Sequence, residues 1–349
     1  MRPFVTRLRE QAAHCLDLGS PLYEALLVGA ADDYEAGGPT RALLAGEDTK
    51  PAGSMPSLRL TGALHRMVLE RKAPELATHF PSVGGDAGVE GAWDAALRLI
   101  EAEPAAIAAR LALPVQTNEV GRAAALLVGI IHAVKESGVR QIRLLEVGAS
   151  AGLTMRLDRF RIGEGADGVG PADSPVQLER PWAAGPPDLS TLWEIVERRG
   201  CDPSPIDPLS TDGRLTLTSY VWADQTHRLE RLRGALQLAE SVPAPVERST
   251  GSAWLQQRLS EPTDAMTIVW HSVVMQYMSP EERARIDAVL ASADLPAPLW
   301  RLGYEPARLE SGEIRFQLSA TEHRGKKPGK PKVIAHGEGH GPPITVVRT

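Results

Sequence analysis

The residues best placed to do chemistry lie between Leu144 and Leu153, in the stretch LLEVGASAGL. This stretch is typical of a buried strand with the acidic Glu146 near its end, followed by a tight turn of small residues and the start of a helix. Gly148 and Gly152 would let a ligand approach the backbone, and the free N–H groups of the following helix would face that ligand. The pattern predicts a nucleotide-type cofactor site at the first strand of a parallel sheet.

Residues 148–152 also match the G-x-S-x-G pattern of a hydrolase nucleophile elbow, with Ser150 as the nucleophile. That mechanism needs an acid and then a histidine later in the chain. Asp264, followed by His323, His336 or His340, has the required order. However, the preceding segments read as helices rather than strands, and no HGGG-type oxyanion segment comes before the turn. A serine hydrolase is therefore the weaker alternative.

A cofactor site of this kind needs a second acid at the end of the second strand, where it accepts hydrogen bonds from ribose hydroxyls. Asp202, in the sequence GCDPSP, has this position. Its separation from Glu146 exceeds the ~20 residues of the simple fingerprint, so we expect an insertion over about 161–190. The predicted cofactor-binding residues are Glu146, Gly148, Ser150, Gly152 and Asp202.

The fourth predicted strand supplies the candidate catalytic residues. A polar side chain at the carboxyl end of a buried strand beside the cofactor turn is well placed to act on a substrate. His271 has this position and is predicted to act as a general base, with an ordinary pKa near 6.5. Tyr277 and Gln276 follow it and would line the same cleft.

Further polar residues are assigned to the lining of the cleft. They are Gln116, Asn118, Glu119 and Arg122 just before the sheet, and Trp222 before a later helix. A helix cap formed by Thr117 or Asn118 is the alternative interpretation of the first group. The histidines of His336–His340 alternate with glycines, which favours a turn over a metal site, so we expect no metal.

The surrounding elements change character near residue 135. Residues 1–135 are predicted to form a helical domain, and residues 136–349 a Rossmann-like α/β domain. Strands are expected at 143–147, 194–198, 246–249, 266–271, 299–303, 314–319 and 333–336. Helices are expected at 18–28, 58–71, 92–101, 119–134, 152–160 and 226–240. A further helix is expected to begin after the N-cap Ser279 and to end at about 291. A hairpin turn is expected over 323–332.

Composition excludes several kinds of partner. The 349 residues are 43% hydrophobic and 23% charged with a net charge of −6, which lacks the basic footprint of a nucleic-acid-binding protein. The two cysteines, Cys15 and Cys201, have no metal or disulfide spacing. No signal-peptide pattern follows the N-terminus, and no segment approaches the ~20 apolar residues of a membrane span. We expect a cytoplasmic protein that binds neither nucleic acid nor membrane.

From about 143 to 290 the chain resembles class I methyltransferases that depend on S-adenosylmethionine (SAM). The resemblance lies in LEVGASAG at 145–152, GCDPSP at 200–205, and VWHS at 269–272 leading into YMSPEE at 277–282. Ser150 stands where the usual E-x-G-x-G-x-G pattern has its central glycine, and no N-P-P-Y segment follows the fourth strand. Nearly the whole chain also resembles an uncharacterised bacterial family, through QTNEVGR at 116–122, DRF at 158–160, SYVW at 219–222 and HSVV at 271–274.

The resemblance implies that Gly148, Ser150 and Gly152 contact the methionine part of SAM, that Glu146 orients its ammonium, and that Asp202 holds the ribose. The resulting prediction is a SAM-dependent methyltransferase acting on a small molecule, with His271 and Tyr277 as catalytic residues. Two alternatives remain: a non-methylating enzyme on a repurposed methyltransferase fold, and a non-catalytic partner in a complex. The prediction also includes a protein partner or a homo-oligomer.

Overall fold

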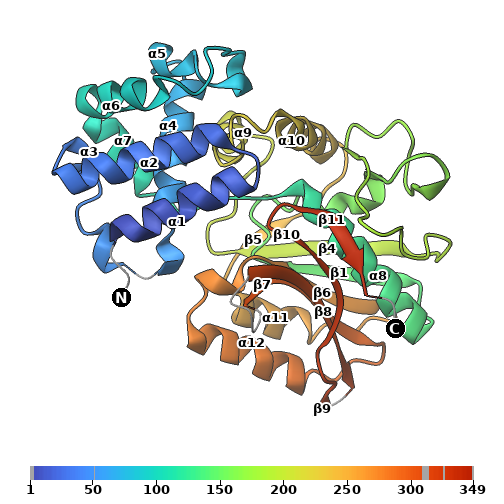
Figure 1. The fold of residues 1–349 in the computed structure, drawn as a ribbon. Coiled ribbons are helices and arrows are strands. Elements are labelled where there is room, and N and C mark those ends of the chain that lie inside the picture. Colours follow the sequence, from blue (N-terminus) through green and yellow to red (C-terminus); the bar gives the residue numbers. More distant parts are fainter. Residues whose placement is uncertain (1–3, 51, 309–313, 325–326, 348–349) are drawn as a thin grey trace. The chain divides into compact units, whose positions relative to one another are not determined.

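The computed structural model describes residues 4–50, 52–308, 314–324 and 327–347. The chain forms two units, one from Met1–Thr117 with Ser210–Glu230 and the other from Asn118–Leu209 with Arg231–Thr349 (Figure 1). This division differs from the predicted boundary at residue 135. The helix before the sheet packs on the sheet, and a later segment returns to the helical unit.

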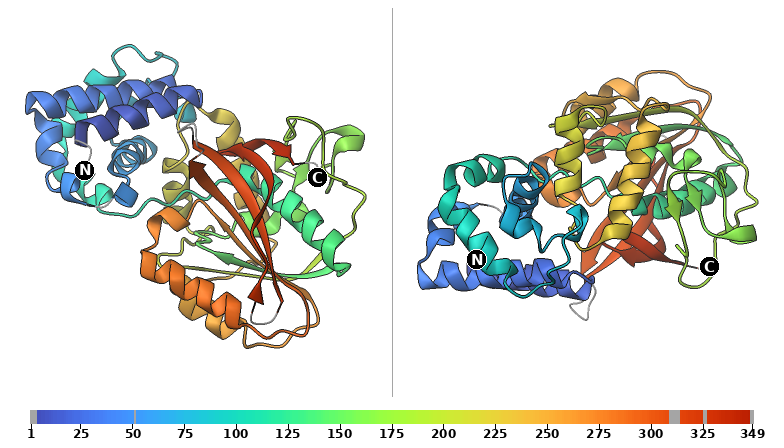
Figure 2. Two further views of the ribbon diagram at one scale, coloured as in Figure 1. Left: turned by 60° about the horizontal axis from the view of Figure 1, so that its bottom comes forward. Right: turned by 90° about the horizontal axis from the view of Figure 1, so that it is seen from above.

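The first unit is helical throughout its described residues, as predicted. Its helices are α1 (Phe4–Asp17), α2 (Pro21–Ala36), α3 (Pro39–Leu43), α4 (Pro56–Leu69), α5 (Pro74–Ala77), α6 (Ala92–Ala102), α7 (Pro104–Leu111) and α9 (Thr211–Ser219). Several of these helices begin with proline, whose missing N–H costs nothing at a first helical position. Figure 2 shows α1 and α2 lying alongside each other, where their apolar faces form part of one core.

Asp224 joins the returning segment to the start of α2. Its carboxylate accepts a hydrogen bond from the N-cap Ser20 Oγ at 2.7 Å and another from Leu22 N at 3.1 Å, so an acid 202 residues further along the chain completes the cap. Trp222 enters the core of the same unit, with its ring centroid 5.8 Å from that of Tyr23. These contacts explain why residues 210–230 belong to the helical unit.

The second unit is a mixed α/β structure built on a nine-stranded sheet, counted over its described residues. The strands run in the order β11-β10-β8-β7-β6-β1-β4-β5, and β9 pairs with β8. Their bounds are β1 (Gln141–Val147), β4 (Glu194–Asp202), β5 (Val246–Arg248), β6 (Met266–Ser272), β7 (Leu299–Arg308), β8 (Ile314–Arg324), β9 (Lys327–Pro328), β10 (Lys332–Glu338) and β11 (Gly341–Val346). The seven predicted strands are confirmed, and β9 and β11 are additions.

The five strands β5-β4-β1-β6-β7 pair in parallel, and the remaining neighbours pair antiparallel. Numbered along the chain, these five have the order 3-2-1-4-5 found in doubly wound sheets. Helix α8 (Ala123–Ser137) contacts one face, where Gly129 lies against Leu302. Helices α11 (Gly251–Arg258) and α12 (Pro280–Ser292) share a core with Leu145 and Val269 on the other face (Figure 2).

Helix α12 begins as predicted, because the Ser279 side chain accepts a hydrogen bond from Glu282 N at 3.2 Å. Helix α10 (Thr226–Ala239) also confirms its prediction. The expected α-helix over 152–160 is wrong: the segment forms the short 3-10 element η5 (Thr154–Arg159), with a kink at Arg156. Side chains elsewhere capture its polar groups, since Asn118 accepts from Leu153 N and Glu146 accepts from Thr154 Oγ1.

The connection from β1 to β4 contains the predicted insertion. It carries a small parallel pair, β2 (Arg161–Ile162) and β3 (Gln177–Leu178), and the 3-10 element η6 (Gly165–Asp167). The predicted hairpin is formed by β8, β9 and β10, although residues 325–326 of its turn lie outside the described residues. A turn joins β10 to β11 at 339–340, as expected for the His336–His340 stretch. Over the described part of the chain, no helix is both long and apolar enough to cross a membrane.

Candidate functional site

The carboxyl ends of the parallel strands bring the predicted acids and histidine to one edge of the sheet. Glu146 is near the end of β1, Asp202 ends β4, and His271 is near the end of β6. Strand β1 lies between β4 and β6, so this is the point where the strand order reverses. Ligands of doubly wound sheets bind at such a point.

Asp202 ties the small-residue turn to β4. Its carboxylate accepts hydrogen bonds from Ser150 N at 3.0 Å and from Ser204 N at 2.8 Å. Gly148 N donates to Cys201 O at 2.9 Å, which fixes the start of the turn. Ser150 has a φ of +51°, and the surrounding bonds hold this left-handed conformation. Two of the four lone-pair positions on Asp202 remain for a ligand.

Glu146 is a buried carboxyl group with one free oxygen. Only 2% of the residue is exposed; Oε1 accepts a hydrogen bond from Thr154 Oγ1 at 2.6 Å, and Oε2 has no partner among the described residues. Burial raises the pKa of Glu146 to about 8, so the group is protonated at pH 7. Trp270 lies opposite it on β6, and its Nε1 is also unpartnered within the described chain. The switch point therefore contains two neighbouring residues with unused hydrogen-bonding capacity.

His271 has partners on both ring nitrogens. Arg301 Nε donates to His271 Nε2 at 3.0 Å, and because Arg301 can only donate, the neutral ring must carry its proton on Nδ1. That proton is donated to Glu305 Oε1 at 2.7 Å. Burial lowers the pKa of His271 below its ordinary value despite the neighbouring Glu305. The predicted role as a general base therefore requires Arg301 to leave Nε2 first.

Glu305 was missed by the sequence reasoning because the fifth strand was expected to end at Gly303. Strand β7 continues to Arg308 and places Glu305 on the same face as Arg301, two positions beyond Gly303. The sequence signal that could have identified Glu305 was the alternation of Arg301, Gly303 and Glu305, which places all three on one face of a longer strand. Glu305 Oε1 also accepts a hydrogen bond from Val274 N at 3.2 Å, whereas Oε2 has no partner among the described residues.

The segment after β6 covers the glycine turn. A Cβ placed on Gly148 would lie 2.3 Å from Val274 Cγ2, so Val274 fills the space directly above this glycine. Val273 has a φ of +52°, an unusual conformation for a β-branched residue. Its N–H donates to Tyr304 O at 2.9 Å, which fixes the bend. A ligand that rests on Gly148 has to displace the Val274 side chain.

The predicted lining residues of this unit separate into exposed and buried ones. Gln276 and Tyr277 lie in the exposed 3-10 element η7 (Met275–Tyr277), and Tyr277 is 42% exposed. Glu119 is buried and accepts from Gly121 N as the cap of η4 (Val120–Arg122). Arg122 is buried and donates to Gly339 O at 3.0 Å and to Ser272 O at 3.4 Å. Asn118 holds Leu153 N, so it positions the turn segment.

Two predicted lining residues belong to the helical unit. Gln116 is buried there, and Trp222 contributes to the core with 5% of its surface exposed. The Arg228 guanidinium lies 5.6 Å from the Trp222 ring centroid. Trp222 therefore packs in the core of the helical unit.

The residues proposed for a serine hydrolase lie at opposite edges of the sheet. Ser150 follows the carboxyl end of β1, whereas Asp264 precedes the amino end of the parallel β6. A seven-residue strand is roughly 20 Å long, so the two side chains are too far apart for a triad. His323 pairs with Leu299, at the start of β7, and thus also lies toward the amino edge.

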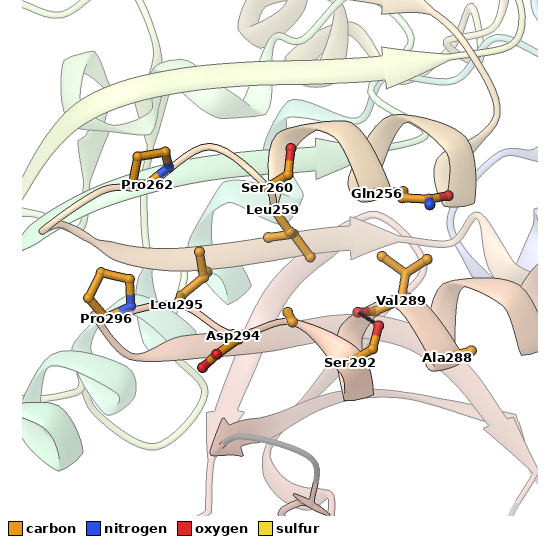
Figure 3. Close-up of a pocket in the computed structure, with 11 residues that line it drawn as sticks. Gln256, Leu259, Ser260, Pro262, Ala288, Val289, Ser292, Asp294, Leu295 and Pro296 are labelled. Atoms are coloured by element: carbon orange, nitrogen blue, oxygen red, sulfur yellow. Dashed lines mark hydrogen bonds between the residues drawn. The ribbon is translucent and has the colours of Figure 1, made fainter.

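An open groove of about 600 Å³ lies between the ends of α11 and α12 (Figure 3). Leu259, Val289 and Leu295 are the largest of its apolar side chains, and Asp294 is the one titratable group among the lining residues. The groove is formed by the residues that precede the amino ends of β6 and β7. It therefore lies away from Glu146, Asp202 and His271. Within the described residues, no group of three or more His, Cys, Asp or Glu side chains is arranged to hold a metal ion.

Comparisons with known proteins identify the family. A search of curated proteins found no match. A family model described as "Uncharacterized protein conserved in bacteria (DUF2332)" matches residues 5–346, which covers both structural units. The resemblance noted over nearly the whole sequence is thereby confirmed, and the chain belongs to this uncharacterised bacterial family.

Proposed function

We propose that this protein is a SAM-dependent enzyme of the methyltransferase type that acts on a small molecule. The observation that supports the proposal is the pair of acids at neighbouring strand ends, Glu146 and Asp202, on either side of a turn with left-handed Gly148 and Gly152. The 3-2-1-4-5 order of the parallel strands places this pair at the switch point of the sheet. These features suit a ligand with a ribose and an amino-acid group.

The chain's own residues would bind and orient the reactants. Asp202 has lone pairs left for ribose hydroxyls while its backbone bonds keep the turn in place. Glu146 would face the ammonium group, and a cation beside it would lower its raised pKa and release its proton. SAM would supply an electrophilic methyl group. Methyl transfer needs alignment above all, so positioning supplies most of the catalysis.

Calorimetric titration with SAM and S-adenosylhomocysteine tests this proposal. We expect saturable binding that Asp202→Asn weakens about tenfold or more, because the variant loses a charged acceptor. Asp207→Asn is the matched control, since Asp207 is an exposed acid in the same loop. Titration at pH 7 in two buffers of different ionisation enthalpy should show release of about one proton, which Glu146→Gln abolishes. Absence of binding by both ligands would refute the proposal.

Val274 favours a second candidate function, a non-methylating enzyme on the same scaffold. Its side chain occupies the space over Gly148 that SAM would use. If the proposal of SAM binding is correct, Val274→Ala should preserve or strengthen SAM affinity because it clears this space. If Val274 is a permanent part of the core, Val274→Ala should lower Tm without creating SAM binding. Differential scanning fluorimetry with and without SAM separates the two functions.

A further inference from the structure

The open groove between α11 and α12 has an apolar floor that continues the core of the second unit. Leu259 belongs to this core, and Val289 and Leu295 pack against it. Figure 3 shows the three side chains in the space between the two helices. The volume of about 600 Å³ is within the range of pockets that bind small molecules. The groove therefore has the size and the floor of a small-molecule site.

The carboxyl ends of both helices border this groove, since its lining includes Leu259 just after α11 and Ser292 at the end of α12. The last carbonyl groups of a helix carry partial negative charge and attract cations. The end of α11 already has a cation of its own. Arg143 Nη1 donates to Arg258 O at 3.3 Å and to Glu261 O at 3.0 Å.

The end of α12 has no such cation. Its last turn contains no basic residue, and within the described chain no backbone N–H donates to the carbonyls of residues 290–292. Asp294 follows the helix, where a negative charge is unfavourable beside the free carbonyl groups. Asp294 is exposed and has no ion-pair partner among the described residues, whereas Asp287 on the same helix is paired with Arg301. The groove therefore combines an apolar floor with one negative end.

We propose that this groove binds a small organic cation with an apolar body, such as an arylalkylamine in its ammonium form. The apolar part of the ligand covers Leu259, Val289 and Leu295, and burial of this surface supplies most of the affinity. The ammonium group lies at the end of α12 beside Asp294, which supplies the preference for a cation. This site is separate from the strand-end site of Glu146 and does not depend on the proposed function.

The probe 2-phenylethylammonium tests the groove, with 2-phenylethanol and 3-phenylpropionate as the neutral and anionic controls. The readout is the methyl resonances of Leu259, Val289 and Leu295 in the full chain, each assigned by a conservative substitution. We expect saturable shifts with the ammonium probe and an affinity about threefold or more lower for the alcohol, because an exposed charge contributes modestly. Equal affinities for the three probes, or shifts only at Val274 beside the strand-end site, would overturn the proposal. Shifts of the same methyl groups on dilution of the protein without a probe would also overturn it, because a second copy of the chain would then occupy the groove.

Variants of Asp294 test the origin of the preference for a cation. Asp294→Asn should weaken binding of 2-phenylethylammonium about threefold and leave binding of 2-phenylethanol unchanged. Asp294→Lys should reverse the preference, so that 3-phenylpropionate binds more tightly than the ammonium probe. Asp264→Asn, an exposed acid outside the groove lining, is the matched control and should change neither affinity. If all three variants bind the probes as the natural protein does, the proposal fails, whatever the titration with SAM shows.

Discussion

The buried acid Glu146 predicts an unusual dependence of stability on pH. Its pKa is raised from 4.5 to about 8, mainly by burial, and the Thr154 hydrogen bond opposes this only in part. Between these two values the folded state keeps a proton that the unfolded state has lost. The free energy of unfolding contributed by this group therefore falls as pH rises, by about 1.4 kcal/mol per pH unit. At pH 7 the accumulated loss is about 3 kcal/mol.

Glu146→Gln removes the titration while it preserves shape and keeps an acceptor for Thr154. The stability of the variant relative to the natural protein should therefore increase steadily from pH 5 to pH 8. The unpaired amide of the variant lowers the free energy of unfolding by an amount that does not change with pH. The test is therefore the slope of the stability difference against pH. Taking the difference also cancels the contribution of His271, which is the same in both proteins.

Urea unfolding monitored by circular dichroism at pH 5, 6, 7 and 8 provides the measurement. Glu136→Gln, an exposed acid on α8, is the matched control and should show no pH-dependent difference. Parallel stability curves for the natural protein and Glu146→Gln would refute the reasoning. They would mean that water or another group satisfies the Glu146 carboxylate in solution.

Three other predictions concern contacts between distant segments. ¹⁵N NMR should find His271 neutral with its proton on Nδ1 at pH 6.5, and Arg301→Met should leave that proton in place because Glu305 Oε1 still accepts it. The contribution of His271 to the free energy of unfolding should fall below this pH, because the unfolded state protonates first. Gly148→Ala should lower the free energy of unfolding by roughly 2 kcal/mol or more, because Gly148 has a φ of +73° and the added methyl group would meet Val274. Adding Val274→Ala to this variant should recover part of the loss, as measured by urea unfolding. Asp224→Ala should destabilise the helical unit by about 2 kcal/mol because Leu22 N and the N-cap hydroxyl of Ser20 lose their acceptor, and unchanged hydrogen exchange in α2 would contradict this.

Local signals predicted the framework of the site. Apolar runs that end in Glu146, Asp202 and His271 identified three parallel strands, and the capping residue Ser279 identified the start of α12. These predictions succeeded because alternation and capping act over a few residues. Parallel strands then bring their carboxyl ends to one edge without further information.

The expected helix after β1 shows where local signals fail. Its sequence permits a helix, but the Arg156 guanidinium, which also donates to the distant Val242 O, takes Gly152 O, the carbonyl that would accept the first α-helical bond, and Arg156 N bonds to Leu153 O in the 3-10 manner. The place of Trp222 in the helical core was not foreseen either, since the return of residues 210–230 to that core depends on contacts with residues near Ser20. Such contacts join parts of the chain that sequence patterns treat separately.

The sequence by itself determined the seven main strands, half of the described α-helices, the acids at the strand ends and membership of the bacterial family. Only the tertiary structure decided the protonation and the hydrogen bonding of the groups at the strand ends. Burial keeps Glu146 protonated, Arg301 and Glu305 fix the tautomer of His271, and Glu305 Oε2 has no hydrogen-bond partner among the described residues. The physical reason is that strand and helix formation depends on neighbouring residues, whereas protonation and hydrogen bonding depend on whatever the fold places within a few ångströms.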